Sequence, residues 1–437
     1  MKREIRLLAV ILPLILLSGY SQVSAEVYTL DKCIETALKN NYGVIAAKNS
    51  YDAARGEIYR AWGNFLPGIN VGARANQSWS GFSYYDIDAR QTISGAQKTN
   101  SFSGALSFSQ SYGGLGLYTY ANLRKKYHDR GSSFNNYVSA NSTLILNVKE
   151  YYYNLLKAKM LLDVATDAVR RGEERLRVVQ SRYDLGAASM SDVLKAKVQY
   201  GSDKLDLVSK TNVYKLALAT LAYTMGVDVT REIEVVEEMP ERGLDIEFNS
   251  ALNEALSQNP DYRKARFDLY GAQDLKLMAY SSFLPSLSVG LSHSTNVDKL
   301  AELTDLGMSD ASYFLYASVN FNIFNGASDY ATLRAAKRNV NTYEQGLKDA
   351  KNWVALELTQ AFLDIGQSEE TTKLAEESVA AAQEDLNLVR EKYKLGAATI
   401  LEVLDAEVSL KQAQTNRVQA IFDYSLAISR LEKVLGR

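Results

Sequence analysis

Two nearly identical stretches, YDLGAASMSDVL at residues 183–194 and YKLGAATILEVL at residues 393–404, stand 210 positions apart in this chain. In both, a Leu-Gly-Ala-Ala segment separates two sequences of strong helical character. Gly186 and Gly396 stand where the end of a helix needs a left-handed backbone, which glycine adopts without steric cost. Each stretch therefore predicts that one helix stops and the chain reverses.

A second helix is predicted to begin directly after each glycine segment. Ser189 and Thr399 are typical N-cap residues, and each is followed three positions later by an acid, Asp192 or Glu402. This is the spacing of a capping box, in which two side chains satisfy each other's backbone N–H groups. The two stretches are therefore predicted to be the tips of two antiparallel helical hairpins.

The repetition extends over the whole chain after the first 25 residues. FLPGINVG at residues 65–72 matches FLPSLSVG at residues 283–290, upstream of the two tips. Self-similarity at this length indicates a duplicated structural unit rather than a short solenoid repeat. We expect a first repeat at residues 26–240 and a second repeat at residues 241–437.

Each repeat also carries alternating segments after its Phe-Leu-Pro. In INVGARANQS every second residue from Ile69 to Ala75 is apolar, and in SVNFNIF the apolar positions include Phe321 and Ile323. A period of two over about ten residues predicts a strand with one apolar and one polar face. We expect β-hairpins at about residues 69–111 and 286–324, and hence four strands in the chain.

Long helices are predicted between these strands and the tips. No proline occurs between Pro67 and Pro240 or after Pro285, and an interior proline would cost a helix about 3 kcal/mol or more. The helices that lead to the tips are expected to have roughly 50 and 60 residues, or ~75–95 Å at ~1.5 Å per residue. Helices of this length need coiled-coil partners.

The first 25 residues are set apart from the fold. A basic start, the apolar run LLAVILPLILL and a small-residue cleavage signal ending at Ala25 are typical of a secretory signal peptide, residues 1–25. Without this segment the net charge changes from −2 to about −4. That charge gives no electrostatic footprint for nucleic acid.

Few residues of the chain suit catalysis. Cys33 is the single cysteine, which excludes an intramolecular disulfide, and His128 and His293 are the only histidines. A metal site or a nucleophile constellation is hard to assemble from this set. Cys33 lies on the apolar helical face of CIETAL, where we expect a buried structural thiol. We therefore expect neither an enzyme nor a bound cofactor or metal.

A membrane crossing is predicted to use strands rather than helices. After residue 25 the sequence holds no run of eighteen apolar residues, about the length that a spanning helix needs. Four strands are too few for a closed membrane barrel, since small barrels begin at about eight, but an oligomer closes them together. A soluble sandwich on a helical stalk is the alternative. The following aromatic residues are expected to flank the first strand as a girdle at the bilayer surface: Trp79, Phe82, Tyr84 and Tyr85.

The order of helix, Phe-Leu-Pro, hairpin, long helix, Leu-Gly-Ala-Ala tip and return helix occurs twice. With LGAATILEVLDAE in the second repeat, it resembles the TolC-like outer membrane efflux proteins over nearly the whole mature chain. The resemblance implies a mixed α and β membrane protein. It would be a homotrimer whose twelve strands form one β-barrel among outer membrane lipid, continuous with a trimeric α-barrel of long antiparallel helices that crosses the periplasm.

The resemblance also implies a function. The protein would be the outer membrane exit channel of a tripartite efflux or type I secretion system, a passive conduit. Its tips would dock a periplasmic adaptor (membrane fusion protein) bound to an inner-membrane pump. Its place would be the cell outer membrane, extending into the periplasm.

The resemblance further points to residues at the channel entrance. In the family, acids just after the second tip ring the mouth, and the matching positions are Glu402 and Asp405, with Asp192 as the counterpart of Glu402 in the first repeat. Capping alone would also explain Asp192 and Glu402, and both roles can coexist. The family's best-known member carries an arginine in the second tip that helps hold the mouth shut. Ala398 stands there in this chain, so that latch is absent or differently built.

The hairpin tips, at residues 183–189 and 393–399, are expected to dock the adaptor. They present small and apolar residues at an exposed end, which is typical of an interaction surface. The residues expected to make this contact are Leu185, Gly186, Ala187, Leu395, Gly396 and Ala397.

Two other classes of protein share part of this pattern. A coiled-coil stalk or adhesin anchored in the outer membrane stays an alternative, although we would expect one terminal anchor rather than a hairpin in each repeat. A periplasmic adaptor would have one helical hairpin flanked by β-domains and no membrane strands. Drugs, metal ions, siderophores and polypeptides all stay open as cargo, because the pump rather than the conduit selects it.

Overall fold

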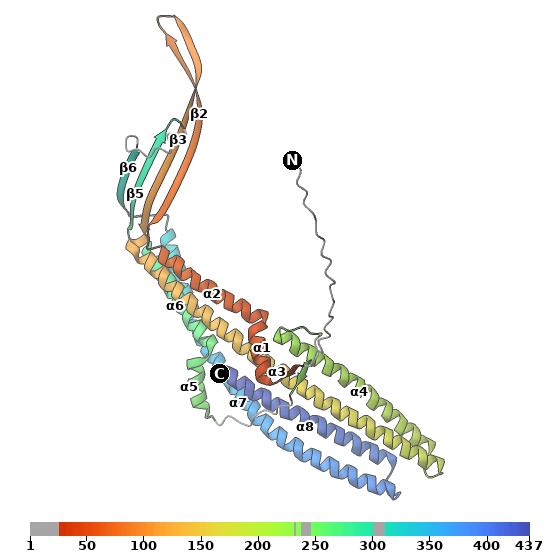
Figure 1. Ribbon diagram of the computed structural model, residues 1–437. Helices are drawn as coiled ribbons and strands as arrows, with labels where there is room; N and C mark the ends of the chain where they lie inside the picture. The colour runs from red at the N-terminus through yellow and green to blue at the C-terminus, as the bar shows by residue number, and fades with distance from the viewer. Residues whose placement is uncertain (1–25, 231–232, 237–245, 300–310) are drawn as a thin grey trace, which may run out of the picture.

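A computed structural model describes residues 26–230, 233–236, 246–299 and 311–437 of the chain. Figure 1 shows an elongated molecule with a β-sheet at one end and long helices that run to the other. The expected signal peptide, residues 1–25, and its cleavage site at Ala25 lie outside the described residues.

The chain passes through the same kinds of element twice. Its first part contains β1 (Glu26–Tyr28), α1 (Leu30–Asn40), α2 (Tyr42–Gly63), β2 (Gly68–Asp86), β3 (Gln91–Tyr112), a 3-10 turn η1 (Gly113–Gly116), α3 (Leu117–Asp184), α4 (Met190–Met225) and β4 (Ile233–Val235). Its second part contains α5 (Phe248–Gln258), α6 (Pro260–Ser281), β5 (Ser286–Val297), β6 (Ala311–Asn320), α7 (Ser328–Lys394) and α8 (Ile400–Leu435).

The main sheet is antiparallel and has the strand order β2-β3-β5-β6, which confirms the four predicted strands. Directly opposite residues of antiparallel strands point to the same face. One row across the sheet is apolar: Ile69, Phe108, Leu291 and Leu315. The next row, on the other face, is more polar: Asn70, Ser107, Ser292 and Phe314. The register thus gathers most apolar positions of β2, β3 and β5 on one side, whereas β6 also carries Phe314 and Tyr316 on the other.

β2 and β3 are about twice as long as predicted. They have 19 and 22 residues, whereas β5 and β6 have 12 and 10. β3 pairs with β5 only over residues 102–112. Residues 76–101 therefore form a two-stranded ribbon that rises beyond the four-stranded sheet (Figure 1). In this ribbon the ring of Phe82 lies directly over Gly95.

Two further predictions about the strands were wrong. β6 ends at Asn320, so Phe321 and Ile323 follow the strand. The backbone turns there, since Gly326 and Ala327 adopt left-handed φ values of +70° and +67° just before α7. The aromatic residues expected to flank the first strand lie inside β2, because aromatic side chains favour strand pairing and extend it: Trp79, Phe82, Tyr84 and Tyr85.

The long helices exceed the predicted lengths. α3 has 68 residues and α7 has 67, which corresponds to ~100 Å each. The prediction for the first helix was too short because α3 already begins at Leu117, directly after Gly116 with its left-handed φ of +92°. Among the described residues, no helix carries a stretch apolar and long enough to cross a bilayer.

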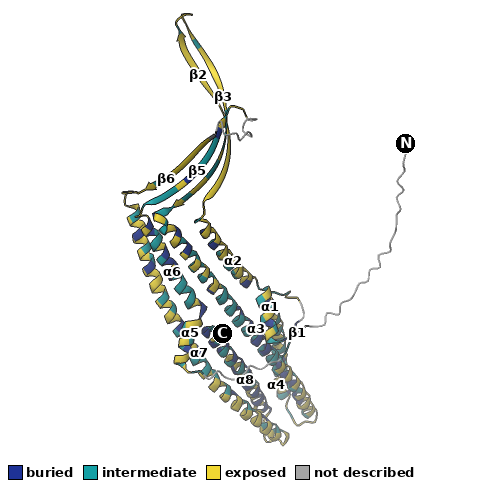
Figure 2. Ribbon diagram, turned by 60° about the vertical axis from the view of Figure 1, so that its left-hand side comes forward, coloured by how far each residue is buried: buried dark blue, intermediate teal, exposed yellow. Residues whose placement is uncertain are grey.

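The helices lie side by side in an order that continues the sheet. Next to the sheet the order is α2-α3-α6-α7, and toward the tips it is α4-α3-α8-α7, so α3 and α7 run through both halves (Figures 1 and 2). Figure 2 shows buried residues where helices meet and exposed residues along the ribbon. The two outer edges are β2, α2 and α4 on one side, and β6 and α7 on the other.

Two small cores brace the middle of the molecule. Cys33 and Ala37 of α1 are fully buried against α3 and α4, and Ala255 of α5 is fully buried against α7 and α8. Burial raises the pKa of the Cys33 thiol to about 12, as a structural thiol requires. The hydroxyl of Tyr152 donates to the carbonyl of Val236 at 2.6 Å and ties the segment after β4 to α3.

Candidate functional site

The two predicted tips are the far ends of helical hairpins (Figure 1). α3 turns into α4 at Gly186, and α7 turns into α8 at Gly396, with φ values of +76° and +75°. In the first tip the N–H of Ala187 donates to the carbonyl of Arg182 at 2.7 Å, and the second tip repeats this bond. This is the hydrogen bond of a Schellman cap, as the glycine predicted.

The end of each tip is apolar and open to solvent. The side chains of Leu185 and Leu395 are 84% and 83% exposed. All the residues predicted for adaptor docking are exposed: Leu185, Gly186, Ala187, Leu395, Gly396 and Ala397. Two leucines held in the open by rigid caps are suited to contact another protein.

Valine at Gly186 or Gly396 is expected to distort its tip at a cost of about 1–3 kcal/mol, because a β-branched residue is forced into the left-handed region. Efflux should fall while the amount of assembled protein in the membrane stays the same. Dye accumulation in intact cells and extraction of the membrane protein measure the two quantities. Gly56→Val is the control, since Gly56 lies in α2 with open space beside it. Normal efflux from both tip variants would contradict docking through these turns.

The acids predicted for the entrance ring are placed by the start of the return helices. Asp192 accepts from the N–H of Ser189 at 3.1 Å, Ser189 accepts from the N–H of Asp192 at 3.2 Å, and Glu402 and Thr399 form the same reciprocal pair. Both predicted capping boxes are thus confirmed. Hydrogen bonds from the cap residues hold the pKa of Asp192 and of Glu402 below their ordinary values. Asp405 is exposed one turn further along α8.

The two tips of one chain touch each other. Arg182, in the last turn of α3, donates from Nη1 to the carbonyl of Tyr393 at 3.0 Å, and its guanidinium lies 4.6 Å from the centre of the Tyr393 ring. That carbonyl belongs to the last turn of α7, and the C-terminal end of a helix attracts cations. We call this contact the tip clasp. An arginine does join the hairpins, but it comes from the first tip rather than from the position of Ala398.

An apolar core lies directly above the tip clasp, between the two hairpins. Its buried members come from α3, α4 and α8: Val179, Val193, Ala196, Ile400, Val403 and Leu404.

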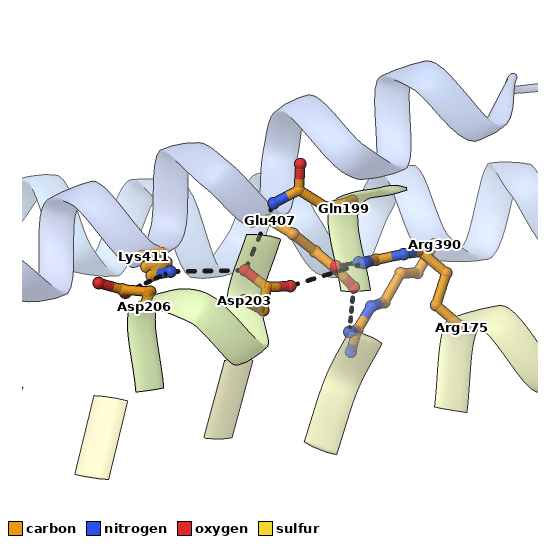
Figure 3. Close-up of polar contacts among 7 residues, drawn as sticks. All are labelled: Arg175, Gln199, Asp203, Asp206, Arg390, Glu407 and Lys411. Carbon is orange, nitrogen blue, oxygen red and sulfur yellow. Dashed lines mark hydrogen bonds and ion pairs between the residues drawn. The ribbon is translucent and has the colours of Figure 1, made fainter. Parts of the chain in front are cut away.

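Further from the tips, charged residues gather where the two helical hairpins meet, and three of them are buried there: Arg175, Asp203 and Glu407 (Figure 3). α3, α4, α7 and α8 all contribute. We call this group the buried charge cluster: Arg175, Gln199, Asp203, Asp206, Arg390, Glu407 and Lys411.

Arg175 of α3 is the centre of the buried charge cluster. Its side chain is 6% exposed, it pairs with Glu407 of α8 through Nη1, and its Nη2 lies 3.9 Å from Asp203 of α4. The other oxygen of Glu407 pairs with Nη2 of Arg390 of α7 at 2.7 Å. Burial lowers the pKa of Arg175 and of Arg390. One carboxylate therefore joins three helices.

Lys411 makes the second link between the hairpins. Its Nζ lies 3.4 Å from Asp203 and 2.8 Å from Asp206, so α8 is tied to α4 as well as to α3. Gln199 donates to Asp203 at 3.3 Å from within α4. Gly172 of α3 makes room for Asp203, since a Cβ there would lie 3.2 Å from its Oδ2.

The sequence prediction did not identify the buried charge cluster. One signal was available, because Glu407 falls on the buried stripe of α8 together with Val403 and Leu410. A charged residue on an apolar helical stripe needs a partner of opposite charge. Within the described part of the chain, no group of three or more His, Cys, Asp or Glu side chains is arranged to hold a metal ion.

A sheet with one largely apolar face, continued by helices of ~100 Å that end in exposed hairpin tips, defines a class of outer membrane channel proteins. The chain matches the family described as "Outer membrane efflux protein" over residues 33–227 and 251–437, and it belongs to this family. This membership confirms the resemblance seen in the sequence and the predicted place in the outer membrane.

Known relatives are similar along most of the chain. It is 23% identical over 428 residues to the outer membrane protein TolC of Escherichia coli, covering 96% of this chain and 84% of that protein. It is 26% identical over 429 residues to the pyoverdine export outer membrane protein OpmQ of Pseudomonas aeruginosa, covering 93% and 83%. The crystal structure of the outer membrane channel CmeC of Campylobacter jejuni superposes with a TM-score of 0.84 at 18% identity, covering 93% of this chain and 85% of that one. CmeC is described as an outer membrane channel, and OpmQ as an outer membrane protein of pyoverdine export.

Proposed function

We propose that three copies of this chain form the exit channel of a tripartite efflux or type I secretion system. The observation that carries the proposal is the agreement between the outer edges of the sheet and of the helices. β2, α2 and α4 form one edge of the molecule, and β6 and α7 form the other. A second copy placed beside the first would therefore extend the sheet and the row of helices together. Such a head-to-tail contact closes into a ring if the rotation fits.

The number of strands agrees with the trimer that the resemblance to the family implies. Four strands per chain give twelve in three copies, and closed membrane barrels begin at about eight strands. The apolar face of the sheet would meet outer membrane lipid. The duplicated units at residues 26–240 and 241–437 would then alternate around the ring, and the exposed tips would dock a periplasmic adaptor bound to an inner-membrane pump.

The edges that would meet between copies are matched in charge and apolar surface. α4 exposes Leu194, Val198, Leu205 and Leu216 beside Lys195, Lys197, Lys204 and Lys215. α7 exposes Leu356, Leu363, Leu374 and Leu388 beside Glu369, Glu370, Glu376, Glu377, Glu384 and Asp385. A lysine-bearing edge on one copy and an acidic edge on the next favour one register of assembly. We call the contact of α4 with α7 of a neighbouring copy the copy seam.

Reversing charges across the copy seam is expected to weaken assembly. Lys197→Glu with Lys204→Glu places like charges opposite the acids of α7, and each exposed pair contributes about 0.2–1 kcal/mol. The trimer fraction in detergent should fall, and more so at low salt, because salt screens such pairs. Glu377→Lys with Asp385→Lys in the same chain should restore it. Native mass spectrometry of the four combinations measures the effect, and equal trimer fractions in all of them would contradict this seam.

Two measurements test the proposed function as a whole. The purified protein should be a trimer that needs detergent and forms pores in planar bilayers, and a bacterium lacking it should retain more of an expelled dye. A monomer that is soluble without detergent would overturn the channel. A trimer that neither conducts nor affects efflux would favour the stalk or adhesin.

A further inference from the structure

Each repeat contains one asparagine that stands between two helices at mid-height of the molecule. Asn41 separates α1 from α2, and Asn259 separates α5 from α6. Both have an extended backbone, with ψ values of 124° and 122°. The two asparagines are as far apart in the sequence as the two Phe-Leu-Pro segments, so they are equivalent positions of the two repeats.

Three helix ends meet at Asn41. Its backbone N–H donates to the carbonyl of Ala37 at 2.8 Å and ends α1. Its Oδ1 accepts from the N–H groups of Gly43 at 2.9 Å and Val44 at 3.4 Å and so caps the start of α2. Its Nδ2 donates to the carbonyl of Thr224 at 3.0 Å, in the last turn of α4. One side chain thus satisfies polar groups of two helix ends that have no partner within their own helices.

Asn259 makes the same contacts in the second repeat. Its backbone N–H donates to the carbonyl of Ala255 at 2.8 Å and ends α5. Its Oδ1 accepts from the N–H groups of Asp261 at 3.0 Å and Tyr262 at 3.2 Å, at the start of α6. Its Nδ2 donates to the carbonyl of Val434 at 3.2 Å, in the last turn of α8. We call each of the two asparagines, with the three helix ends that it joins, an asparagine bracket.

The helix ends in each asparagine bracket are in direct contact. Gly226 caps α4 with a φ of +69°, and a Cβ there would lie 2.7 Å from the carbonyl oxygen of Asn40. Gly436 caps α8 with a φ of +81°, and a Cβ there would lie 3.0 Å from the backbone carbonyl of Gln258. The negative end of the helix that returns from a tip therefore lies against the positive end of the helix that leads to the sheet, which helix dipoles favour.

The joined helices have equal lengths in the two repeats. α2 and α6 have 22 residues each, and α4 and α8 have 36 residues each. At ~1.5 Å per residue, α4 and α8 each extend ~54 Å from their bracket toward a tip, and α2 and α6 each extend ~33 Å toward the sheet. Equal lengths give the two tips equal heights only if neither joint slides or opens.

We infer that Asn41 and Asn259 are positioning residues, which hold the two tips at one height and so let both dock on the same partner. This inference rests on the proposed function, since it takes the tips as the docking surface. The amide is suited to this task, because its oxygen caps the helix on the sheet side while its nitrogen holds the helix on the tip side. Aspartate offers no donor for the second bond, and the hydroxyl of serine is shorter.

Two substitutions of Asn41 separate the cap from the joint. Asn41→Asp keeps an oxygen for the cap of α2, but it loses the donor to Thr224 and places a negative charge at the C-terminal end of α4. Asn41→Ser keeps the cap without the charge. Amide hydrogen exchange of the detergent-solubilised protein, read by mass spectrometry, should be about three- to tenfold faster in the last turn of α4 for both variants, because one hydrogen bond is lost. The first turn of α2 should exchange as in the unaltered protein.

The second repeat and an exposed asparagine supply the matched variants. Asn259→Asp and Asn259→Ser should speed exchange in the last turn of α8 and leave the first turn of α6 unchanged. Asn212→Asp makes the same chemical change at an exposed position of α4 and should alter neither helix end. Unchanged exchange at the ends of α4 and α8 in all of these variants would overturn the asparagine brackets.

Efflux connects the asparagine brackets to docking. Intact cells with Asn41→Asp or Asn259→Asp should retain more dye, while the amount of protein in the membrane and its conductance in planar bilayers stay unchanged. Normal efflux from variants whose helix ends exchange faster would overturn the positioning of the tips, although the channel itself would still be supported. An unaltered protein that forms no pores and expels no dye would instead overturn the proposed function, and the exchange rates would then still test the joints.

Discussion

Glutamine in place of Glu407 is expected to lower the free energy of unfolding by about 3–5 kcal/mol, since it breaks a buried ion pair from one side. Glu407 is 10% exposed and pairs with both Arg175 and Arg390. The neutral amide leaves Arg175, which is 6% exposed, without its nearest opposite charge, and only Asp203 at 3.9 Å remains beside it. Urea unfolding of the detergent-solubilised protein, followed by helical circular dichroism, measures the loss.

Two variants control for the chemistry of the substitution. Glu35→Gln makes the same change at an exposed position of α1 and should alter stability by no more than about 0.5 kcal/mol. Arg175→Gln combined with Glu407→Gln removes both charges, so it should cost less than the sum of the two single changes. A loss below about 1 kcal/mol for Glu407→Gln alone would show that water reaches Arg175 and that the cluster does not hold the hairpins.

The tips were predictable because every signal for them is local. Gly186 and Gly396 need a left-handed backbone that only a few neighbouring residues decide, and Ser189 and Thr399 bond to acids three positions away. Such signals can be recognised in the sequence without knowledge of the tertiary structure. The same holds for the existence of the long helices, which the absence of proline permits, although their lengths were predicted too short.

The buried charge cluster was not predictable in the same way. Arg175 and Glu407 are more than 200 positions apart and meet only because α3 packs on α8. A charged residue on the buried face of a helix indicates that a partner of opposite charge is needed, but it does not indicate which helix supplies that partner. Arg182 is a similar case, because its position in the last turn of α3 predicts a favourable dipole contact, whereas the structure directs it to Tyr393 of the other hairpin.

The strand lengths show a third limit of prediction from the sequence. Their existence followed from the period of two, but their lengths depended on pairing between distant segments. β2 and β3 continue to residues 86 and 91 because they pair with each other, and β5 accompanies β3 over residues 102–112 only. Strand length in a hairpin is set by the partner as much as by the pattern.

Removing Glu402 and Asp405 together is expected to abolish most of the block of the channel by divalent cations. With Asp192 these acids would give up to nine carboxylates around a three-fold axis, and rings of acids bind and select cations. The cap bonds use one carboxylate oxygen of Glu402, so the other stays available. In planar bilayers with cations added on the tip side, Glu402→Ala with Asp405→Ala should weaken the block by about tenfold or more, which corresponds to ~1.4 kcal/mol.

Two further measurements test the cation block: its dependence on pH, and the effect of removing an acid that lies outside the ring. The cap bonds hold the pKa of Asp192 and of Glu402 below their ordinary values of 3.8 and 4.5. These carboxylates therefore stay charged through mildly acidic pH, and the block should be lost only as the pH falls through those lowered values. Asp184→Ala removes an exposed acid at the first tip that is outside the ring, and it should leave the block unchanged. If the double variant kept both its block and its cation selectivity, Glu402 would be a capping residue only and Asp405 an ordinary acid on the surface of α8.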